Sequence, residues 1–313
     1  MDALDVKILR LLMMGGGSFV GSDVRRPYRL IASKLQVTED TVRNRVEKFR
    51  EDGFVRGWKL GINPTLFGRR ASFLTLDVRP PSSIEDALQK ISLIDGVLFI
   101  VCYFGGHLGV HLTYESERSF EKTKELVARI CNSENLLSMK LSFPACAMKL
   151  TKTDWNLLKA LQGNTRKPIG VLAREAGVSP KTAKRRIENL LGDGALYTLP
   201  DINARALRGG VASSLLVLYD EKGIARQVAS KIIAQFDESL LLFHVADPEY
   251  GWFAFVQPNI SKTKEVDRWV RDLQGVRSTS LRLVEDFVNL ATEAFRGELD
   301  KKIAVGIPQI QSK

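Results

Sequence analysis

The pattern of apolar positions predicts two consecutive short helices within residues 171–196. Leu172 and Ala173 mark a first amphipathic helix, which the turn residue Gly177 ends. Ser179 is a favourable N-cap and proline follows it at the first helical position, so a second helix begins there. Since the apolar residues of this second helix recur at helical spacing, its polar residues point away from the core. These outward residues are Lys181, Thr182, Lys184, Arg185 and Arg186.

The same pattern occurs once more, 141 positions earlier, at residues 30–55. The two stretches align without a gap, and Thr38 takes the place of the capping Ser179. A short helix, a tight turn and a basic second helix are typical of a helix-turn-helix whose recognition helix enters the DNA major groove. An ordinary helical hairpin with a solvated charged face is the alternative, and the duplication favours the helix-turn-helix.

Each copy has flanking elements of the same kind. A supporting helix is expected at residues 2–13 and again at 153–161, and short β-ribbon wings are expected at 54–60 and 195–199. The glycine cluster at 15–22 has no Lys-Ser/Thr after it, so it is interpreted as a flexible insertion and not as a phosphate-binding loop. We therefore predict two winged helix-turn-helix domains, at residues 1–68 and 149–209.

The two remaining segments both show the order β-α-β-β-α-β, which is typical of a ferredoxin-like domain. These domains are predicted at residues 69–148 and 210–284. Both helices of such a domain lie on one face of its sheet, so the other face needs a partner, and two sheets in one chain can cover each other. The first copy has strands at 71–78, 97–103, 109–114 and 136–143; the second has strands at 211–219, 240–245, 252–257 and 276–284.

A helix at 287–302 and a disordered tail complete the C-terminal segment, 285–313. The predicted fold class is thus α+β, with two winged helix-turn-helix domains alternating with two ferredoxin-like (βαββαβ) domains.

The charge distribution supports contact with nucleic acid. The 313 residues carry a formal charge of +10, of which residues 1–68 hold +4 and residues 149–209 hold +7, while the other segments are close to neutral. Positive charge that gathers on the two helix-turn-helix segments is what a phosphate-contacting surface requires.

Other features of the composition predict a cytoplasmic protein that does not enter a membrane. With 44% hydrophobic residues the chain is globular and has several cores. Its acidic first residues are unlike a signal peptide, and its longest apolar runs are too short to span a bilayer. Cys102, Cys131 and Cys146 have no metal-like spacing, so reduced and mostly buried thiols are expected.

The DNA-contact candidates lie on the recognition helices and wings. Arg43, Asn44, Lys184 and Arg185 are expected at base edges, because they are exposed in the first turns. Arg45 and Arg186 lie one position further round and are expected at either a phosphate or a neighbouring carboxylate. The remaining candidates, including the backbone contacts of the wings, are Thr41, Lys48, Arg56, Trp58, Lys59, Lys181 and Thr182.

The chain resembles the Lrp/AsnC (feast/famine) transcription factors, most closely their archaeal members. The resemblance rests on residues 4–9 (LDVKIL), the helix-turn-helix at 32–53, and residues 62–68 (INPTLFG) before the β-α-β-β-α-β segment. It covers nearly all of residues 1–284 in two successive copies, whereas family members ordinarily have one unit per chain. The chain therefore looks like two units fused.

This resemblance implies a sequence-specific DNA-binding regulator of transcription, not an enzyme, with no cofactor and no metal. The implied partners are double-stranded DNA, further copies of the chain through the sheets, and an amino acid or other small effector. The family's effector site uses a Gly-x-x-Asp turn, and neither copy keeps it cleanly. The effector candidates in the corresponding turns are Gly105, Gly106, His107, Asp247 and Tyr250.

Two other function classes remain open. Sirohaem decarboxylases look similar to these regulators, and His244 with the segment 250–253 faintly resembles their sequence, although no Tyr-x-Arg triplet accompanies it. His107 and His111 share a strand face as metal ligands would, yet ordinary strand histidines are the favoured interpretation. A scaffold without DNA binding is the third class, and the basic triplet at 184–186 argues against it.

Overall fold

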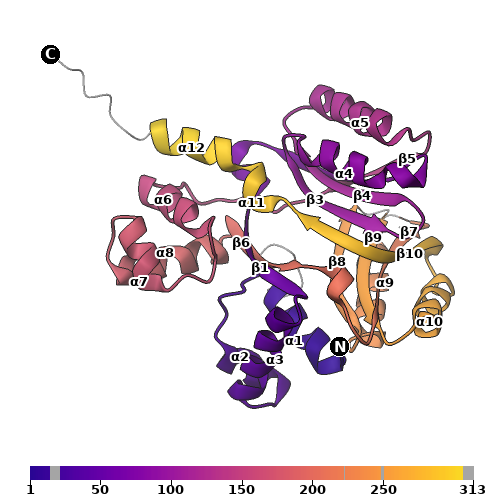
Figure 1. Cartoon of the computed structure of the whole chain (residues 1–313), viewed down its shortest axis with the longest axis horizontal. Coiled ribbons are helices and arrows are strands. Elements are labelled where there is room, and N and C mark those ends of the chain that lie inside the picture. Colours follow the sequence, from indigo (N-terminus) through magenta and orange to yellow (C-terminus); the bar gives the residue numbers. More distant parts are fainter. Residues whose placement is uncertain (15–21, 222, 248–249, 306–313) are drawn as a thin grey trace.

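The computed structural model describes residues 1–14, 22–221, 223–247 and 250–305. Figure 1 shows two groups of helices beside a large curved sheet that carries its own helices. Two predictions concern other residues: the glycine-rich insertion, of which only Ser22 is described, and the disordered tail.

The first helical unit consists of α1 Ala3–Met13, α2 Tyr28–Leu35 and α3 Glu39–Glu51. Asp2 and Asp5 form a reciprocal capping box that begins α1. The side chain of Thr38 caps α3 by accepting a hydrogen bond from the backbone N–H of Thr41 at 3.1 Å. The predicted supporting helix and helix pair are therefore all present.

The second helical unit consists of α6 Lys152–Leu161, α7 Ile169–Glu175 and α8 Pro180–Gly192. Ser179 caps α8 through the backbone N–H of Thr182 at 3.2 Å, with Pro180 at the first helical position. Gly177 and Gly194 adopt the left-handed conformation after α7 and α8, and Gly177 follows the first helix as the sequence predicts.

The two predicted wing segments form strands, but they pair with each other across the two helical units. β1 Val55–Ile62 and β6 Leu196–Ile202 make an antiparallel two-stranded sheet in which Trp58 lies opposite Pro200. Gly61 lies opposite Tyr197, whose ring occupies the space that a side chain at position 61 would need. The ribbon thus ties the first helical unit to the second.

Eight strands form one continuous sheet in the order β5-β2-β4-β3-β10-β7-β9-β8. The first half contains β2 Arg70–Asp77, β3 Val97–Tyr103, β4 His107–Tyr114 and β5 Leu136–Leu141, with helices α4 Ile84–Ser92 and α5 Glu117–Cys131. The second half contains β7 Val211–Tyr219, β8 Leu240–Asp247, β9 Tyr250–Gln257 and β10 Val276–Asn289, with helices α9 Ala225–Gln235 and α10 Ile260–Arg271. Short turns η1 Pro64–Phe67, η2 Pro81–Ser83 and η3 Ala204–Ala206 connect these elements.

The sheet curls until its outer strands, β5 and β8, come into contact. Helices α4 and α5 cover the outer face of the first half, and α9 and α10 cover the outer face of the second (Figure 1). The uncovered inner faces therefore turn toward each other, as expected from the sequence, but they belong to one continuous sheet and not to the two separate sheets that were predicted.

Strand β10 is longer than predicted, and the helix expected at 287–302 begins later. The first part of β10 pairs with β7, and the last part of β10 pairs with β3. In the pairing with β3, Phe287 lies opposite Val101 and Asn289 lies opposite Phe99. Phe287 stacks on Phe99 with ring centroids 5.5 Å apart, so burial on the inner sheet face outweighs the helical pattern. The helices that follow are α11 Ala291–Ala294 and α12 Arg296–Val305.

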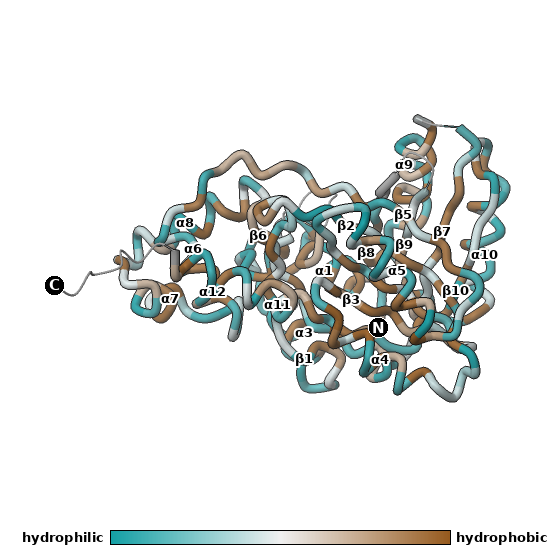
Figure 2. The backbone as a smooth tube through the Cα atoms, turned by 90° about the horizontal axis from the view of Figure 1, so that it is seen from above, coloured by the Kyte–Doolittle hydropathy of each residue, from teal (hydrophilic) through white to brown (hydrophobic). Residues whose placement is uncertain are grey.

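The described residues contain three hydrophobic cores. One core lies between each half of the sheet and its own helices, and the third joins both helical units to the inner sheet faces. Figure 2 shows this distribution, with hydrophobic strands such as β3 inside and a more hydrophilic surface at helices such as α10. No helix in the described part of the chain is long and apolar enough to cross a membrane.

We predict that Gly61→Ala destabilises the protein by about 1–3 kcal/mol, the range for overpacking a well-packed site. A Cβ at position 61 would lie 2.0 Å from the Tyr197 ring, so the ring or the ribbon must move. Gly57→Ala in the same strand is the control, because a Cβ at position 57 would have no neighbouring atom within 4 Å. Urea unfolding of both variants tests the prediction, and equal loss in the two would contradict it.

Candidate nucleic-acid interface

The outward face of α3 presents the side chains that the sequence singles out. Arg43 and Asn44 are exposed, while Val42, Val46 and Phe49 are buried on the opposite face. Arg43 pairs with Glu39 at 2.9 Å and lies over the Tyr28 ring at 5.8 Å. Because acidic residues occupy the first turn, part of the positive charge of α3 is neutralised within the helix.

The outward face of α8 carries more uncompensated charge. Lys181, Lys184 and Arg185 are exposed, and the first turn contains no acidic residue. Lys184 has one carboxylate nearby, Glu188 at 3.9 Å, and Arg185 has no ion pair within the described residues. These three side chains are free to meet an anionic partner.

Arg45 and Arg186 turn toward carboxylates of the supporting helices. Arg45 donates to Asp2 at 2.7 Å and to Asp5 at 2.9 Å. Burial acts to raise the pKa of the Asp2 carboxyl, but the backbone N–H of Asp5 and the guanidinium of Arg45 outweigh it, and the pKa is lowered. The sequence leaves phosphate and carboxylate open for this arginine, and in the structure it holds α3 to the N-terminus of α1.

Arg186 makes the equivalent contact in the second unit. Its Nη2 donates to Asp154 Oδ2 at 2.7 Å and to Thr151 Oγ1 at 2.7 Å, and Asp154 is fully buried. The pair therefore fixes α8 against the N-terminus of α6.

The predicted contact residues of the ribbon have partners within the protein. Arg56 pairs with Asp201 at 3.2 Å and donates to the backbone carbonyls of Ile202 and Phe287. Lys59 pairs with Glu293 at 3.0 Å. The structure thus places Arg56 and Lys59 between the ribbon and the C-terminal segment.

The two helical units contact each other directly. The Arg166 guanidinium, from the loop before α7, lies over the rings of Tyr28 at 4.6 Å and Trp58 at 5.2 Å. Arg25 donates to the backbone carbonyls of Thr165 at 2.6 Å and Lys167 at 2.9 Å. The relative placement of α3 and α8 is consequently set inside a single chain.

The effector candidates lie in two separate turns, one in each half of the sheet. Gly105 and Gly106 form a turn with positive φ, and His107 next to it bonds to Asp77 at 2.5 Å. Asp247 lies opposite Tyr250 in the β8–β9 pair, and Tyr250 lines a cavity that does not include His107.

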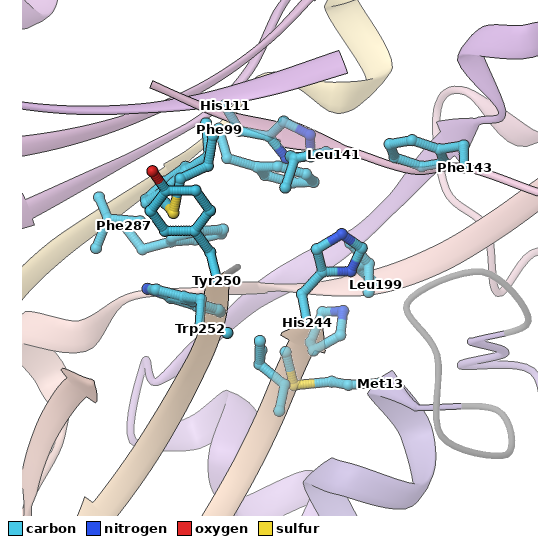
Figure 3. Close-up of a pocket in the computed structure, with 16 residues that line it drawn as sticks. Met13, Phe99, His111, Leu141, Phe143, Leu199, His244, Tyr250, Trp252 and Phe287 are labelled. Carbon is cyan, nitrogen blue, oxygen red and sulfur yellow. The ribbon is translucent and has the colours of Figure 1, made fainter. Parts of the chain in front are cut away.

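That cavity lies between the two halves of the sheet and contains two histidines. Figure 3 shows His111 of β4 on one wall and His244 of β8 reaching toward it from the other, with Tyr250 and Trp252 beside them. Burial lowers the pKa of His111 to about 3, helped by the nearby His244, and burial lowers the pKa of His244 to about 4. Both rings are therefore neutral at pH 7.

No sequence pattern links His111 with His244, which are 133 positions apart. They belong to strands of different halves, and the curl of the sheet brings them to one cavity. The described residues contain no group of three or more His, Cys, Asp or Glu side chains that could hold a metal. Cys102 and Cys131 are buried and Cys146 is partly buried, all as free thiols, and burial raises the pKa of each.

Family models match α6 to α8 of the second helical unit, and α2 and α3 of the first. Residues 150–191 match the AsnC-type helix-turn-helix domain. Residues 22–56 match the siroheme decarboxylase NirDL-like HTH domain.

Characterised relatives align with parts of the chain. It is 30% identical to regulatory protein AsnC of Haemophilus influenzae over 146 residues, which are 44% of this chain and 91% of that protein. It is 33% identical to HTH-type transcriptional regulator Ptr1 of Methanocaldococcus jannaschii over 99 residues, 31% of this chain. In that case the alignment spans 61% of the relative's length.

One solved structure resembles the whole chain in fold. The siroheme decarboxylase NirDL superposes with a TM-score of 0.55 at 16% identity, covering 96% of this chain and 99% of that one. The same enzyme in complex with an iron-uroporphyrin III analogue gives a TM-score of 0.53.

We predict that Arg186→Ala lowers the free energy of unfolding by about 2–4 kcal/mol, because it leaves the buried Asp154 carboxylate without its cation. Arg185→Ala, one position earlier and exposed, should change it by less than about 0.5 kcal/mol. Urea unfolding compares the two variants. If Arg186→Ala is as stable as Arg185→Ala, the ion pair of Arg186 with Asp154 does not stabilise the contact between α8 and α6.

Proposed function

We propose that this chain, which belongs to the Lrp/AsnC family, is a sequence-specific DNA-binding regulator of transcription that carries two recognition helices. The single observation that supports this most is that one chain holds two helices, α3 and α8, with exposed arginine or lysine side chains on their outward early turns. The relatives named HTH-type transcriptional regulator Ptr1 and regulatory protein AsnC support the same function. We propose no enzymatic activity, cofactor or metal.

The proposed domain organisation is two tandem units. Each unit comprises a winged helix-turn-helix domain and a ferredoxin-like domain, with boundaries 1–68, 69–148, 149–209 and 210–284 and a C-terminal segment from 285. The whole-chain likeness in fold and the repeated element order support this organisation. The sheet half of the second unit extends to Asn289, because β10 ends there.

The side chains proposed for base edges are Arg43, Asn44, Lys184 and Arg185. They are exposed on the early turns of the two helices, where recognition helices touch bases. Lys181 and Lys48 are proposed to contact phosphates, and Thr41 and Thr182 are proposed to contact the DNA backbone from the helix starts. Arg45 and Arg186 support the recognition helices through the carboxylates that they already hold.

One molecule would then act as a pseudo-dimer on an asymmetric site. Both recognition helices belong to one chain, so two half-sites about 34 Å apart can be bound without a second copy. The two helices differ in exposed residues, so the half-sites are unlike. Further self-association through the sheets and the binding of an effector are separate proposals.

A sirohaem decarboxylase is the second candidate. It is favoured by the likeness in fold to NirDL, the NirDL-like match at 22–56, and two histidines in one cavity. A decarboxylase substrate carries carboxylates, and none of the 16 residues that line the cavity has a charged side chain to pair with them. We therefore place this function second.

We predict that purified protein incubated with sirohaem shows no stoichiometric absorbance band after gel filtration, because the cavity offers carboxylates no counter-charge. Albumin serves as the control for non-specific tetrapyrrole binding. A bound band that His244→Ala abolishes, together with release of carbon dioxide, would favour the enzyme instead.

The DNA-binding proposal predicts unequal contributions from the two recognition helices. Lys184→Ala/Arg185→Ala should weaken DNA binding more than Arg43→Ala/Asn44→Ala, because α8 carries more uncompensated charge. Each lost phosphate contact should lower the slope of log K against log salt by about 0.9. Gel shifts on a selected site at several salt concentrations measure both quantities.

Lys122→Ala/Lys231→Ala is the matched control, since both lysines are exposed on sheet-covering helices. Equal losses from the two helix variants, or a strictly palindromic selected site, would mean that two chains each use one helix. Absence of any discrete site would refute specific regulation.

A further inference from the structure

The cavity between the sheet halves is also the place where all parts of the chain meet. It encloses about 80 Å³. Met13 comes to it from α1 of the first helical unit, and Leu199 from the ribbon strand that follows the second. Phe99 and His111 come from one half of the sheet, and His244 from the other. An occupant would therefore touch both halves of the molecule at once.

The walls favour an uncharged occupant. They are built mainly from aromatic rings and aliphatic side chains, and none of the 16 lining residues carries a charge at neutral pH. Burying a zwitterion or a carboxylate against such walls is unfavourable because no counter-charge compensates its lost hydration. The cavity is thus unsuited to a free amino acid.

Three polar side-chain atoms of lining residues are buried without a hydrogen-bond partner among the described residues, and they are the indole Nε1 of Trp252 and two histidine nitrogens. Nε2 of His111 and Nε2 of His244 are closed off from solvent and have no hydrogen-bond partner in the described part of the protein. Buried polar groups are normally satisfied, and leaving one unpaired is unfavourable. Since both histidine nitrogens lie on rings that line one cavity, a ligand that supplies a hydrogen-bonding group would remove this penalty.

The volume limits the size of the ligand. An apolar cavity of about 150 Å³ admits benzene, and the space here is smaller, about 80 Å³. A molecule of about one ring therefore matches this space with modest adjustment of the surrounding side chains.

We propose that this cavity binds a small uncharged molecule of about one ring with one hydrogen-bonding group, which contacts His111 or His244. Because the occupant would touch α1 and β6 as well as both sheet halves, its binding would regulate the placement of the recognition helices. This regulatory part rests on the proposed DNA-binding function, whereas the binding itself does not.

Three probes of similar size test the binding. Phenol is neutral and has a hydrogen-bonding group, toluene is neutral and lacks one, and benzoate is charged. In thermal unfolding of the full chain, phenol should raise the melting temperature at lower concentration than toluene, with about ten-fold tighter binding, the value of one net hydrogen bond. Benzoate and the free amino acids should give no shift. No shift with phenol, or an equal shift with benzoate, would overturn the proposal.

The variants His111→Phe and His244→Phe test the contacts. Phenylalanine keeps the ring and removes the unpaired nitrogen, so each variant should be at least as stable as the parent without ligand. In at least one of them the ten-fold preference for phenol over toluene should fall to about one, while toluene still binds. An unchanged preference in both variants would refute the role of the histidines.

Gel shifts with and without phenol separate this proposal from the proposed function. A change in DNA affinity that phenol produces at its binding concentration, toluene only at about ten-fold higher concentration and benzoate not at all, would support regulation through the cavity. Phenol binding in a protein without DNA affinity would refute the DNA-binding proposal and leave the ligand site intact. DNA binding without phenol binding would refute the site alone.

Discussion

The arrangement of the molecule depends on β10, the strand that belongs to both halves of the sheet. Its residues 276–283 pair with β7, and its residues 284–289 pair with β3. A strand shared in this way makes the two halves one sheet, and a register slip of one residue would turn Phe287 away from Phe99. Because the sheet then curls onto itself, the two inner faces cover each other and leave a small cavity between them.

The positions of the helical units follow from this sheet. α1 lies against the second half, where Arg10 donates to the backbone carbonyl of Asp237 at 2.8 Å. The ribbon of β1 and β6 and the stack of Arg166 on Tyr28 then relate one unit to the other. Within each helical unit, a charged hydrogen bond holds the second helix of the pair to the supporting helix. Arg45 donates to Asp5 in the first unit, and Arg186 donates to Asp154 in the second.

Local patterns in the sequence are sufficient to predict the helices, the strands and the exposed basic residues. This is because a helical period and a cap depend on only a few neighbouring positions. Contacts between distant segments cannot be read in this way. The wing strands are predictable, but their mutual pairing depends on residues about 140 positions apart. The end of β10 has apolar residues that suit a helix or a strand, and only the facing β3 decides between them. His111 and His244 look unremarkable singly, since their shared cavity exists only after the sheet closes.

Joining both halves in one chain removes the requirement that the two units use the same contacts, which a symmetric dimer would impose. The first unit is held to the sheet through Arg10 and Asp237. The second is held by the C-terminal segment, where Lys159 pairs with Asp300 of α12 at 2.8 Å. Phe67 stacks on Phe295, which lies between α11 and α12, and also contacts Trp155 of α6. The cavity likewise receives a helix residue, Met13, from the first unit and a ribbon residue, Leu199, from the second. A change in the cavity would therefore act on the two units through different elements, so the two recognition helices need not move together.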